Sequence, residues 1–437
     1  MKKKTIAIVT LGCSKNLVDS EDLATRIAQK YDVVYFNNDD QYASDVDIVI
    51  INTCGFILDA KQESIDTIIY YANLKTEGVI KKLFVFGCLS QRYKEDLAKE
   101  IPECDEFFGV NTLKDILDRL DVEDFDNPCD HTRLISTAKH TTYIKIAEGC
   151  NRKCSFCAIP YIRGNYISRS MEEIIEEVKL LASNGTKEFN LIAQDLSYYG
   201  KDLYHDFKLP ELVEQLAKID GVHWIRMHYT YPNNFPLKTL DLMKDNPKVC
   251  HYLDIPVQHI SDHILSDMKR GHTKAETVAL IKKFREIVPD ITLRTSLLVG
   301  FPGETEEDID ELAEFIKEAK FDRLGVFQYS EEEGTYSAEH FKDDVPEEVK
   351  QERADRIMSI QQRISLQLNV AKIGKTMEII IDRQEAEFWV GRTMFDSPEV
   401  DCEVLVKISD APNFEIGNFY NVEITDVQEF DLFAKPV

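Results

Sequence analysis

The stretch Glu148-Gly-Cys150-Asn-Arg-Lys-Cys154-Ser-Phe-Cys157-Ala-Ile-Pro160 places three cysteines in the spacing CxxxCxxC. Three thiolates on one short loop can hold three irons of a [4Fe–4S] cluster, and the fourth iron then stays open to bind a substrate. Zinc sites favour paired CxxC units with a second pair nearby, and ferredoxin-type clusters use four cysteines. The loop therefore predicts an iron–sulfur site with one open iron, and three unrelated buried thiols are the alternative.

The chain around this loop alternates strand-like and helical patterns, which predicts an α/β barrel over residues 142–372. Helical patterns such as Met171–Ser183 and Glu304–Ala319 separate the strands, and Glu347–Ala371 is expected to form one long helix. The loop follows the first strand, where α/β barrels place catalytic groups. The six predicted strands form a full or an incomplete barrel and are Tyr143–Ile146, Glu188–Ile192, His223–His228, His251–Ile255, Ile291–Val299 and Arg323–Gln328.

Residues 1–122 are predicted to form a separate α/β domain with a doubly wound parallel sheet. Its strands are apolar throughout, which is typical of parallel strands covered on both faces. The predicted strands are Thr5–Leu11, Val46–Ile51 and Leu83–Phe86. The predicted amphipathic helices are Asn16–Tyr31, Ala60–Leu74 and Gln91–Ile101.

Cys13, Cys54 and Cys88 each follow one of these three strands directly. The carboxyl ends of parallel strands lie at one edge of a sheet, so we expect the three thiols to converge there. A glycine adjoins each cysteine, which allows the close backbone approach that a cluster needs. With a cluster loop downstream, this arrangement predicts a second cluster, and three small buried residues at strand ends are the alternative.

The last part of the chain, residues 373–437, is predicted to form a small all-β barrel of about OB-fold size. An acidic segment rich in turn formers, residues 123–141, is expected to link the first domain to the α/β barrel. The predicted strands of the C-terminal barrel are Thr376–Ile381, Phe388–Arg392, Val400–Ile408 and Phe419–Asp426.

The composition is that of a globular protein, with 43% hydrophobic and 30% charged residues. No apolar run approaches the roughly 20 residues that a membrane span needs, so we expect a cytoplasmic protein without a membrane partner. The 437-residue chain has 52 basic and 78 acidic side chains, and its net charge of −26 favours basic partners over phosphate backbones. Four of the ten cysteines have no cluster context and are expected to be structural, namely Cys104, Cys129, Cys250 and Cys402.

Polar residues at the ends of the later barrel strands are candidate ligand contacts, because catalytic groups gather at that face. The turn at Gly300 allows close backbone approach to a ligand, although an ordinary barrel turn is an equal alternative. Each polar side chain could instead be a satisfied group in a barrel layer. The candidates are Gln194 with Asp195, Arg226 with His228, and Gln258 with His259.

The CxxxCxxC loop resembles the signature of the radical-SAM superfamily, in which an aromatic residue precedes the third cysteine. Phe156 occupies that position, and the resemblance implies that it packs near the adenine of S-adenosylmethionine (SAM). The main chain just after the third cysteine, at Ala158, is expected to contact the base. The resemblance thus implies cofactor-binding roles for Phe156, Ala158, Gln194, Arg226 and Gly300.

The three predicted domains together resemble the radical-SAM methylthiotransferase family over essentially the whole chain. In this family the C-terminal barrel is a TRAM domain. The resemblance implies two [4Fe–4S] clusters, one on Cys13, Cys54 and Cys88 and one on the CxxxCxxC cysteines. All six cysteines are then metal ligands and catalytic residues: Cys13, Cys54, Cys88, Cys150, Cys154 and Cys157.

Several strings look like the branch that modifies an aspartate of small-subunit ribosomal protein twelve, rather than the branch that modifies an adenosine in tRNA. Among them are Asn52-Thr-Cys-Gly-Phe-Ile57 and Met227-His-Tyr-Thr-Tyr-Pro232. After its first cysteine the chain has Ser14-Lys-Asn16, where the tRNA branch typically has a Gln-Met-Asn type string. The chain departs from the ribosomal branch at Ser14 and within Tyr329–Gly334, where that branch usually has prolines.

The resemblance implies that a radical formed from SAM removes a hydrogen from the aspartate β-carbon, and that a second SAM methylates the inserted sulfur. An electron donor such as flavodoxin or ferredoxin and a monomeric enzyme are expected. Lys375 to Val437 contain five basic and fourteen acidic side chains, a net −9, which suits a basic ribosomal protein better than RNA. A tRNA methylthiotransferase and a non-catalytic iron–sulfur assembly factor are the alternatives.

Overall fold

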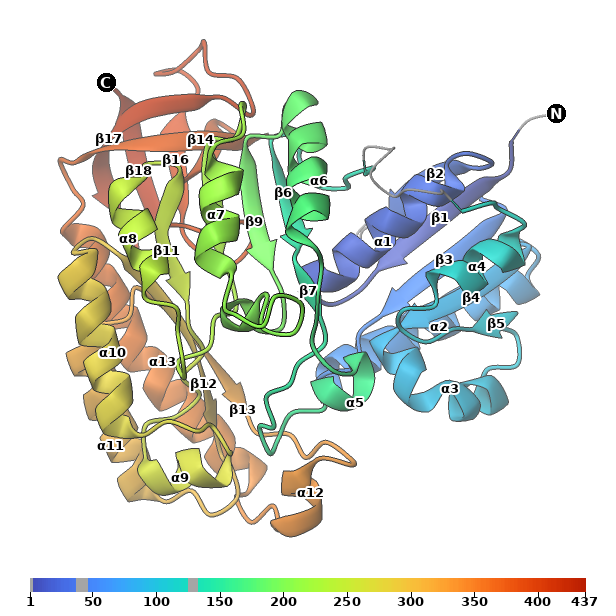
Figure 1. Ribbon diagram of the computed structural model, residues 1–437, viewed down its shortest axis with the longest axis horizontal. Helices are drawn as coiled ribbons and strands as arrows, with labels where there is room; N and C mark the ends of the chain where they lie inside the picture. Colours follow the sequence, from blue (N-terminus) through green and yellow to red (C-terminus); the bar gives the residue numbers. More distant parts are fainter. Residues whose placement is uncertain (1–2, 37–45, 125–132) are drawn as a thin grey trace.

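The computed structural model describes residues 3–36, 46–124 and 133–437 of the chain. It consists of an N-terminal α/β part, a larger α/β part and a small C-terminal barrel, which lie beside one another as Figure 1 shows. Cys129 and residues 125–132 of the predicted linker 123–141 lie outside the described residues. In the ranges that are described, no helix has the length and apolar character needed to cross a membrane.

The N-terminal part contains five parallel strands in the order β2-β1-β3-β4-β5. This is a doubly wound order of the flavodoxin type, in which the direction of strand addition reverses between β1 and β3 and ligands bind at the carboxyl ends nearby. The sequence predicted three of the strands and missed β2 and β5. The strands are β1 Thr5–Thr10, β2 Asp32–Phe36, β3 Ile48–Thr53, β4 Lys82–Gly87 and β5 Glu106–Phe107.

Helices cover both faces of this sheet, as right-handed crossovers require on either side of the reversal. The helices α1 and α4 bury Leu23 and Ile116 with Ile6 and Ile8 on one face. The helices α2 and α3 enclose the other face, where side chains such as Val9 pack. The helices are α1 Ser14–Ile27, α2 Leu58–Thr76, α3 Cys88–Glu100 and α4 Leu113–Leu120.

The middle part is built on six parallel strands in the order β13-β12-β11-β10-β9-β6. The two outer strands do not pair with each other, so the sheet forms an incomplete barrel, one of the two forms that the sequence predicted. A two-stranded ribbon of β7 (Ala147–Glu148) and β8 (Ile167–Ser168) adjoins the first strand. The six strands are β6 Thr141–Lys145, β9 Glu188–Ile192, β10 Trp224–Met227, β11 Val249–Asp254, β12 Thr292–Val299 and β13 Arg323–Gln328.

Helices surround this partial barrel, and three of them begin with capping boxes that satisfy their first N–H groups. The capping residues are Ser170, Thr273 and Thr305. The predicted long helix is confirmed as α13, which packs against β13 and α11. The helices are α5 Ile159–Arg163, α6 Met171–Ser183, α7 Leu209–Ala217, α8 Lys238–Asp245, α9 Asp262–Asp267, α10 Lys274–Ile287, α11 Glu306–Ala319, α12 Tyr336–His340 and α13 Glu347–Val370, with a 3-10 turn at Leu196–Tyr198.

The C-terminal part is a closed barrel in the order β14-β15-β16-β18-β17. Alternate residues of its strands, such as Ile379, Val404 and Leu432, fill the interior. The sequence missed β18, which closes the barrel by pairing in parallel with β16 and antiparallel with β17. The strands are β14 Thr376–Glu385, β15 Phe388–Thr393, β16 Glu403–Lys407, β17 Phe419–Val427 and β18 Asp431–Pro436.

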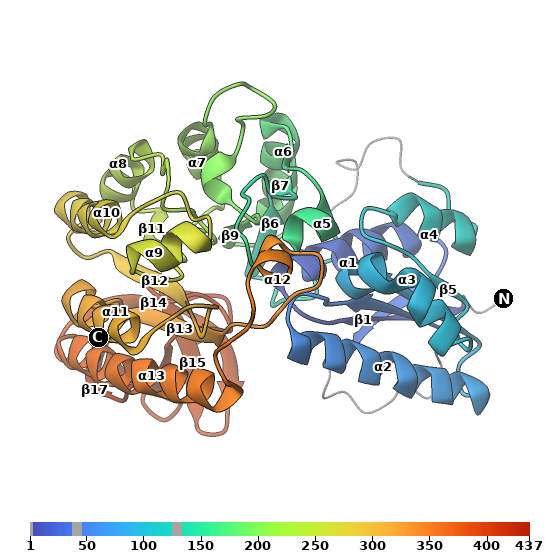
Figure 2. The ribbon, with the colours of Figure 1, turned by 90° about the horizontal axis from the view of Figure 1, so that it is seen from below.

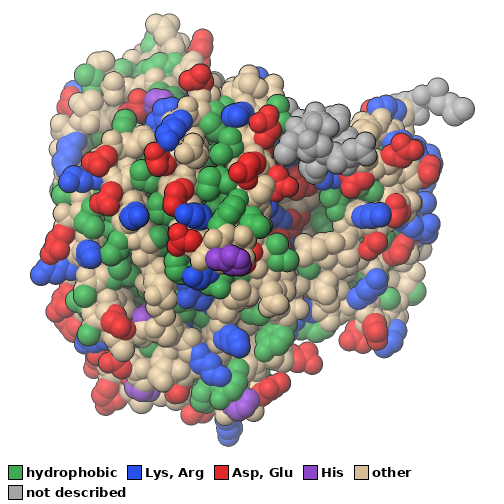
Figure 3. Space-filling view, in the orientation of Figure 1, with side chains coloured by type: hydrophobic (Ala, Val, Ile, Leu, Met, Phe, Trp, Pro, Cys, Tyr) green, Lys and Arg blue, Asp and Glu red, His purple; other side chains and the backbone are tan. Residues whose placement is uncertain are grey.

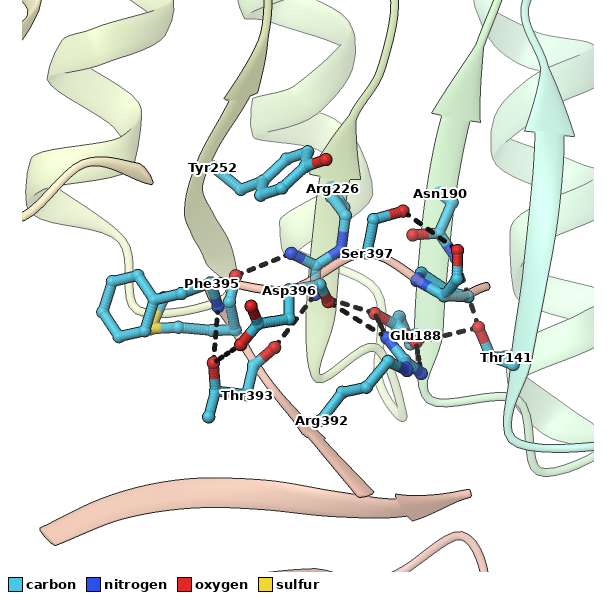
Figure 4. A network of polar contacts seen from close by, with 12 residues as sticks. Thr141, Glu188, Asn190, Arg226, Tyr252, Arg392, Thr393, Phe395, Asp396 and Ser397 are labelled. Atoms are coloured by element: carbon cyan, nitrogen blue, oxygen red, sulfur yellow. Dashed lines mark hydrogen bonds and ion pairs between the residues drawn. The ribbon is translucent and has the colours of Figure 1, made fainter. Parts of the chain in front are cut away.

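A buried ionic network joins the C-terminal barrel to the inner surface of the partial barrel (Figure 4). Glu188 at the start of β9 accepts from Arg392 at 2.7 Å and from Arg226 at 3.0 Å. Burial alone would raise the pKa of Glu188, but these two guanidinium groups outweigh it and hold the pKa well below its ordinary value. Asp396 pairs with Arg323 at 2.5 Å in the same interface, so the C-terminal barrel is fixed by charges and not by apolar packing alone.

We expect Glu188→Gln to lower the free energy of unfolding by about 3–5 kcal/mol, because it leaves the buried Arg226 without a carboxylate and Arg392 with Asp382 alone. The pKa of Glu188 is lowered in the folded protein. The stabilisation is therefore present above the unfolded value of about 4.3 and is lost as the pH falls. Urea denaturation at pH 7 and at pH 4 measures both effects.

Glu214→Gln is the matched control, because Glu214 forms an exposed pair with Lys218 one helical turn away, at 2.9 Å. Its expected cost is below about 0.5 kcal/mol. Equal costs for the two substitutions would contradict a structural role for the buried network.

Candidate active site

The CxxxCxxC loop runs from β7 to α5 at the carboxyl end of β6, where the sequence placed it. Its backbone is held by neighbouring segments: Cys150 N donates to Gly164 O at 3.1 Å, and Ser155 N donates to Met268 O at 3.0 Å. Cys150 is 9% exposed, whereas Cys154 and Cys157 are half-buried. The loop is thus a fixed element of the barrel mouth.

Positively charged side chains surround Cys154. Arg270 Nη1 donates to its Sγ at 3.2 Å, and Tyr231 Oη lies 3.6 Å from the same sulfur. The guanidinium groups of Arg270 and Arg152 lie 4.2 and 4.1 Å from the centroid of the Tyr231 ring. Asp195 holds Arg152 through a 2.8 Å hydrogen bond. These contacts place hydrogen-bond donors and positive charge beside the Cys154 sulfur.

Cys13, Cys54 and Cys88 lie at the carboxyl ends of three adjacent strands. Cys13 is the N-cap of α1 and Cys88 is the first residue of α3. Helix N-termini carry partial positive charge, so both positions favour an anion. Burial raises the pKa of Cys88 to about 11, Arg163 opposes that shift, and the neighbouring thiols Cys13 and Cys54 add to it. The three sulfurs therefore lie within electrostatic reach of one another.

Gly12 is needed for Cys13 and Cys54 to approach each other. Its φ is +89°, and a Cβ at this position would lie 2.7 Å from Cys54 Cβ and 2.9 Å from Cys54 Sγ. A side chain on Gly55 or Gly87 would likewise collide with neighbouring atoms. The glycines beside the cysteines thus allow close packing at this edge of the sheet.

The two sets of cysteines meet across the interface between the N-terminal part and the partial barrel. Arg163, at the end of α5, donates from Nε to Cys88 Sγ at 3.3 Å and from Nη2 to Asn16 Oδ1 at 2.6 Å. Ala158 and Ile162 pack directly on Cys88. Figure 2 shows α5 between the two parts. The segment just after the CxxxCxxC loop therefore forms a wall of the second cysteine site.

Ion pairs fix this interface on two sides. On one side Lys145 of β6 pairs with Asp19 of α1, and Arg163 also bonds Asp19 at 2.8 Å. On the other side Glu332, which follows β13, accepts from Arg92 at 2.7 Å and from Lys61 at 2.8 Å. The N-terminal part therefore contacts both free edges of the incomplete barrel.

The chemistry of both sites fits a cluster better than a single metal ion. Across the described ranges, no group of three or more His, Cys, Asp or Glu side chains is arranged to hold one ion. The cysteines of a [4Fe–4S] cluster bind different irons and so stand apart. Burial raises the pKa of Cys150 to about 11, but it also raises the pKa of the structural Cys104, so burial does not identify ligands. Arginine donors to sulfur do distinguish Cys88 and Cys154.

Three of the five predicted cofactor-binding residues lie beside the loop. Phe156 packs in an apolar group with Phe301 and Phe341, and Ala158 packs on Cys88. Gln194 Nε2 donates to Glu148 Oε1 at 3.0 Å. Among the residues that the structure describes, the buried Oε1 of Gln194 has no hydrogen-bond partner, so it can accept from a ligand.

The structure does not bring the other two predicted cofactor-binding residues, Arg226 and Gly300, to the CxxxCxxC loop. Arg226 is fully buried and donates to Glu188 and to Met394 O in the C-terminal barrel interface. Gly300 has a φ of +75° and packs against the Lys350 side chain. A Cβ built on Gly300 would lie 2.3 Å from Lys350 Cγ. The candidates His228 and His259 are also buried and contact Ser397 and the backbone N–H of Ser261.

Sequence reasoning missed Arg163, Arg270 and Lys15, which is two residues after Cys13. Each acts on a partner far away in the chain, so no local pattern identifies it. Arg163 follows the CxxxCxxC loop closely and precedes a glycine. This position is the one sequence feature that could have indicated its role.

Three family models match consecutive parts of the chain. Residues 5–109 match the uncharacterized protein family UPF0004, residues 144–316 match the radical SAM superfamily and residues 373–437 match the TRAM domain. The same order of a parallel sheet, a radical SAM barrel and a closed β-barrel is present in the structure. The middle part is thus a radical SAM domain, and membership of that superfamily implies a [4Fe–4S] cluster and SAM.

Relatives over the full length narrow the assignment. A ribosomal protein uS12 methylthiotransferase RimO of Bacteroides thetaiotaomicron is 53% identical over 100% of this chain and 99% of its own. RimO proteins of Parabacteroides distasonis (100% and 99% covered) and Christiangramia forsetii (100% and 95% covered) are 49% and 50% identical. The chain belongs to the RimO family of ribosomal protein uS12 methylthiotransferases.

Solved structures with a similar fold are more distant in sequence. The radical SAM methyltransferase TsrM of Kitasatospora setae has a TM-score of 0.54 and 14% identity, over 74% of this chain and 72% of its own. The cobalamin-dependent radical SAM enzyme OxsB has a TM-score of 0.51 and 12% identity, over 83% and 56%. They support the fold alone.

Gly12→Ala is expected to remove about half of the iron bound after anaerobic reconstitution, because the new methyl group would displace Cys54 Sγ. Gly78→Ala is the matched control: Gly78 has a similar φ of +78° but no atom within 4 Å of its Cβ position. Both substitutions carry the same backbone strain, so only the contact with Cys54 differs. Equal iron contents in the two variants, measured by iron assay, would contradict a cluster on Cys13, Cys54 and Cys88.

Proposed function

We propose that this protein attaches a methylthio group to the β-carbon of an aspartate in ribosomal protein uS12, using two [4Fe–4S] clusters and two SAM molecules per turnover. The contact between Arg163 and Cys88 Sγ, 3.3 Å long, carries the proposal. It joins the end of the CxxxCxxC segment to the second set of cysteines. One substrate carbon placed between the two sets can therefore be reached from both.

We assign one cluster to Cys150, Cys154 and Cys157, with SAM beside Phe156, Ala158 and Gln194, and the other to Cys13, Cys54 and Cys88. When bound, SAM and the clusters supply the radical that removes the β-hydrogen and the methylated sulfur that replaces it. Arg226 and Gly300 act on SAM only through the scaffold, because their neighbours are Glu188 and Lys350.

The chain's own side chains hold the reacting groups in place. Arg270 is fixed by a 2.6 Å bond from Nη2 to Pro256 O while its Nη1 donates to Cys154 Sγ. Asp195 orients Arg152 from the opposite side. These residues keep positive charge next to the sulfur and keep the loop from moving, which is the kind of preorganisation that lowers a reaction barrier.

The C-terminal barrel favours a basic protein as substrate. Some of its acidic residues dock it on the partial barrel, such as Asp396 with Arg323 and Asp401 with Arg294. Arg392, one of its five basic residues, is buried in that interface. Eight acidic side chains remain exposed on it: Glu378, Glu385, Glu387, Glu399, Asp410, Glu415, Asp426 and Glu429. This surface repels RNA phosphates and attracts a ribosomal protein.

One face of the molecule offers room for an extended substrate. Figure 3 shows a recess between the N-terminal part and the partial barrel, with acidic side chains along it. A ribosomal substrate would place the enzyme in the cytoplasm. An electron donor such as flavodoxin or ferredoxin and a monomeric enzyme stay predictions.

Cysteine substitutions test the division of labour between the two sets. Cys154→Ala is expected to abolish formation of 5′-deoxyadenosine, because it removes a ligand of the cluster that binds SAM. Cys54→Ala is expected to keep SAM cleavage and to stop methylthiolation. Cys104→Ala, a control in the turn before β5 whose thiol donates to backbone oxygens, should retain both activities. Methylthiolation by the Cys54 variant would overturn the two-cluster mechanism.

Competition between substrates tests the choice of uS12. The reduced holoenzyme is incubated with SAM, uS12 and unmodified tRNA in one anaerobic reaction, and each product is examined by mass spectrometry. We expect a methylthio mass gain on an aspartate of uS12 and none on tRNA. A gain on tRNA would make the chain a tRNA methylthiotransferase, and SAM that stays uncleaved would favour an assembly factor.

A further inference from the structure

Lys15 is a buried cation in the first turn of α1, between the N-terminal cysteines and the barrel mouth. It is only 8% exposed, and its Nζ lies 3.0 Å from the centroid of the Tyr229 ring. Within the part of the chain that the structure describes, its ammonium forms no ion pair with a carboxylate. Buried lysines are rare unless paired, so this ammonium lacks the anion that its burial calls for.

The position on the helix adds to that imbalance. Lys15 follows the N-cap Cys13, and the first turn of α1 contains no acidic residue. The N-terminal end of a helix carries partial positive charge, so a lysine there is electrostatically unfavourable. The site therefore combines a buried ammonium and a helix N-terminus with no negative side chain between them.

The charge of Lys15 reaches the barrel. Burial lowers the pKa of His228, and Arg226, Arg294 and Lys15 lower it further. For Cys88, the cation that opposes the effect of burial is Arg163. The ammonium of Lys15 thus faces the carboxyl ends of the barrel strands, while Arg163 serves the sulfurs.

Asp254 is a buried carboxylate on the barrel that feels the charge of Lys15, and one of its oxygens is already engaged. Its Oδ2 accepts from Tyr229 N at 3.2 Å and lies 3.7 Å from Arg294 Nη1. Burial raises the pKa of Asp254, and Arg294 opposes this more strongly than Lys15 does. Asp254 and Asp401 thus share Arg294, and in the described ranges no carboxylate forms an ion pair with Lys15.

Tyr229 holds the ammonium at a fixed place. Its φ of +60° is rare for an aromatic residue, and two hydrogen bonds maintain it, from its own N–H to Asp254 and from Leu196 N to its carbonyl oxygen at 3.0 Å. Its ring packs with Val18 of α1 and Ile192 of β9. Such strain at a ligand-facing position is typical of functional sites.

We propose that Lys15 binds the side-chain carboxylate of the target aspartate and thereby determines that an acidic residue is modified. The inference rests on the proposed function and deepens it. The carboxylate carbon of aspartate is bonded to the β-carbon that reacts. An ammonium that holds the carboxylate therefore also fixes the reacting carbon, which is one bond away from the carboxylate carbon. It would hold that carbon between the two sets of cysteines.

The test is a cycle of two substitutions measured by binding. The holoenzyme and its Lys15→Met and Lys15→Arg variants are titrated with uS12 and with uS12 whose target aspartate is changed to asparagine. We expect Lys15→Met to weaken binding of native uS12 by roughly 10- to 100-fold and to leave the asparagine form unchanged. Lys15→Arg should recover part of the preference for aspartate.

Lys269→Met is the matched control, because Lys269 Nζ lies 2.9 Å from the Tyr336 ring but the residue is exposed. It should change binding of both forms of uS12 by less than about twofold. Iron content and SAM affinity are measured for every variant. Iron content reports on folding and on cluster loading. SAM affinity tests whether Lys15 binds the carboxylate of SAM instead of the carboxylate of aspartate.

Each other outcome would overturn the inference in a recognisable way. If Lys15→Met weakens SAM binding instead, the carboxylate belongs to SAM. If it lowers the iron content by about half, Lys15 balances the charge of the N-terminal cluster. If it weakens both forms of uS12 equally, or neither, Lys15 does not read the aspartate. If the unsubstituted holoenzyme binds no uS12, the proposed function itself fails.

Discussion

Arg163 connects the two halves of the active site. Its guanidinium donates to Cys88 Sγ, to Asn16 and to Asp19 of the N-terminal part, while its backbone ends the helix that follows the CxxxCxxC loop. A planar group with five N–H donors can serve several acceptors at once, which a lysine could not do. This one side chain, together with the ion pairs at the two edges of the barrel, therefore sets the relative position of the two cysteine sets.

A second set of charged side chains, at the opposite end of the partial barrel, likewise fixes one part of the protein against another. Glu188 lies inside the partial barrel and receives Arg392 from the C-terminal barrel and Arg226 from its own sheet. Buried ion pairs contribute little net stability compared with apolar packing, but breaking one is costly, so they favour one arrangement over others. The acidic excess of the C-terminal barrel thus has two roles, since some carboxylates dock it and others stay available to a basic partner.

Much of the fold was predictable because long parallel strands are apolar throughout and the cysteines follow them directly. Three strands were not predicted, namely β2, β5 and β18. The strand β5 has only two residues and exists through pairing with β4, and β18 is paired in parallel with β16, which is not its neighbour in the chain. The six cysteines were predicted as cluster ligands from spacing and strand ends, and the structure places each set at one edge of a parallel sheet. Arg163, Arg270 and Lys15 were not found, because their partners belong to other parts of the protein. Arg226 looked like a ligand contact because a polar strand end has the same pattern whether it faces a ligand or a neighbouring domain.

The contact of the N-terminal part with both free edges of the incomplete barrel has a mechanical consequence. Asp19 holds the β6 edge, and Lys61 with Arg92 holds Glu332 beyond the β13 edge. The N-terminal part acts as a brace across the open seam of the barrel. Widening the seam to admit a large protein strains both attachments at once, whereas releasing one turns the other into a hinge. Any displacement of the N-terminal part from either edge would therefore also move Cys13, Cys54 and Cys88 relative to the CxxxCxxC loop.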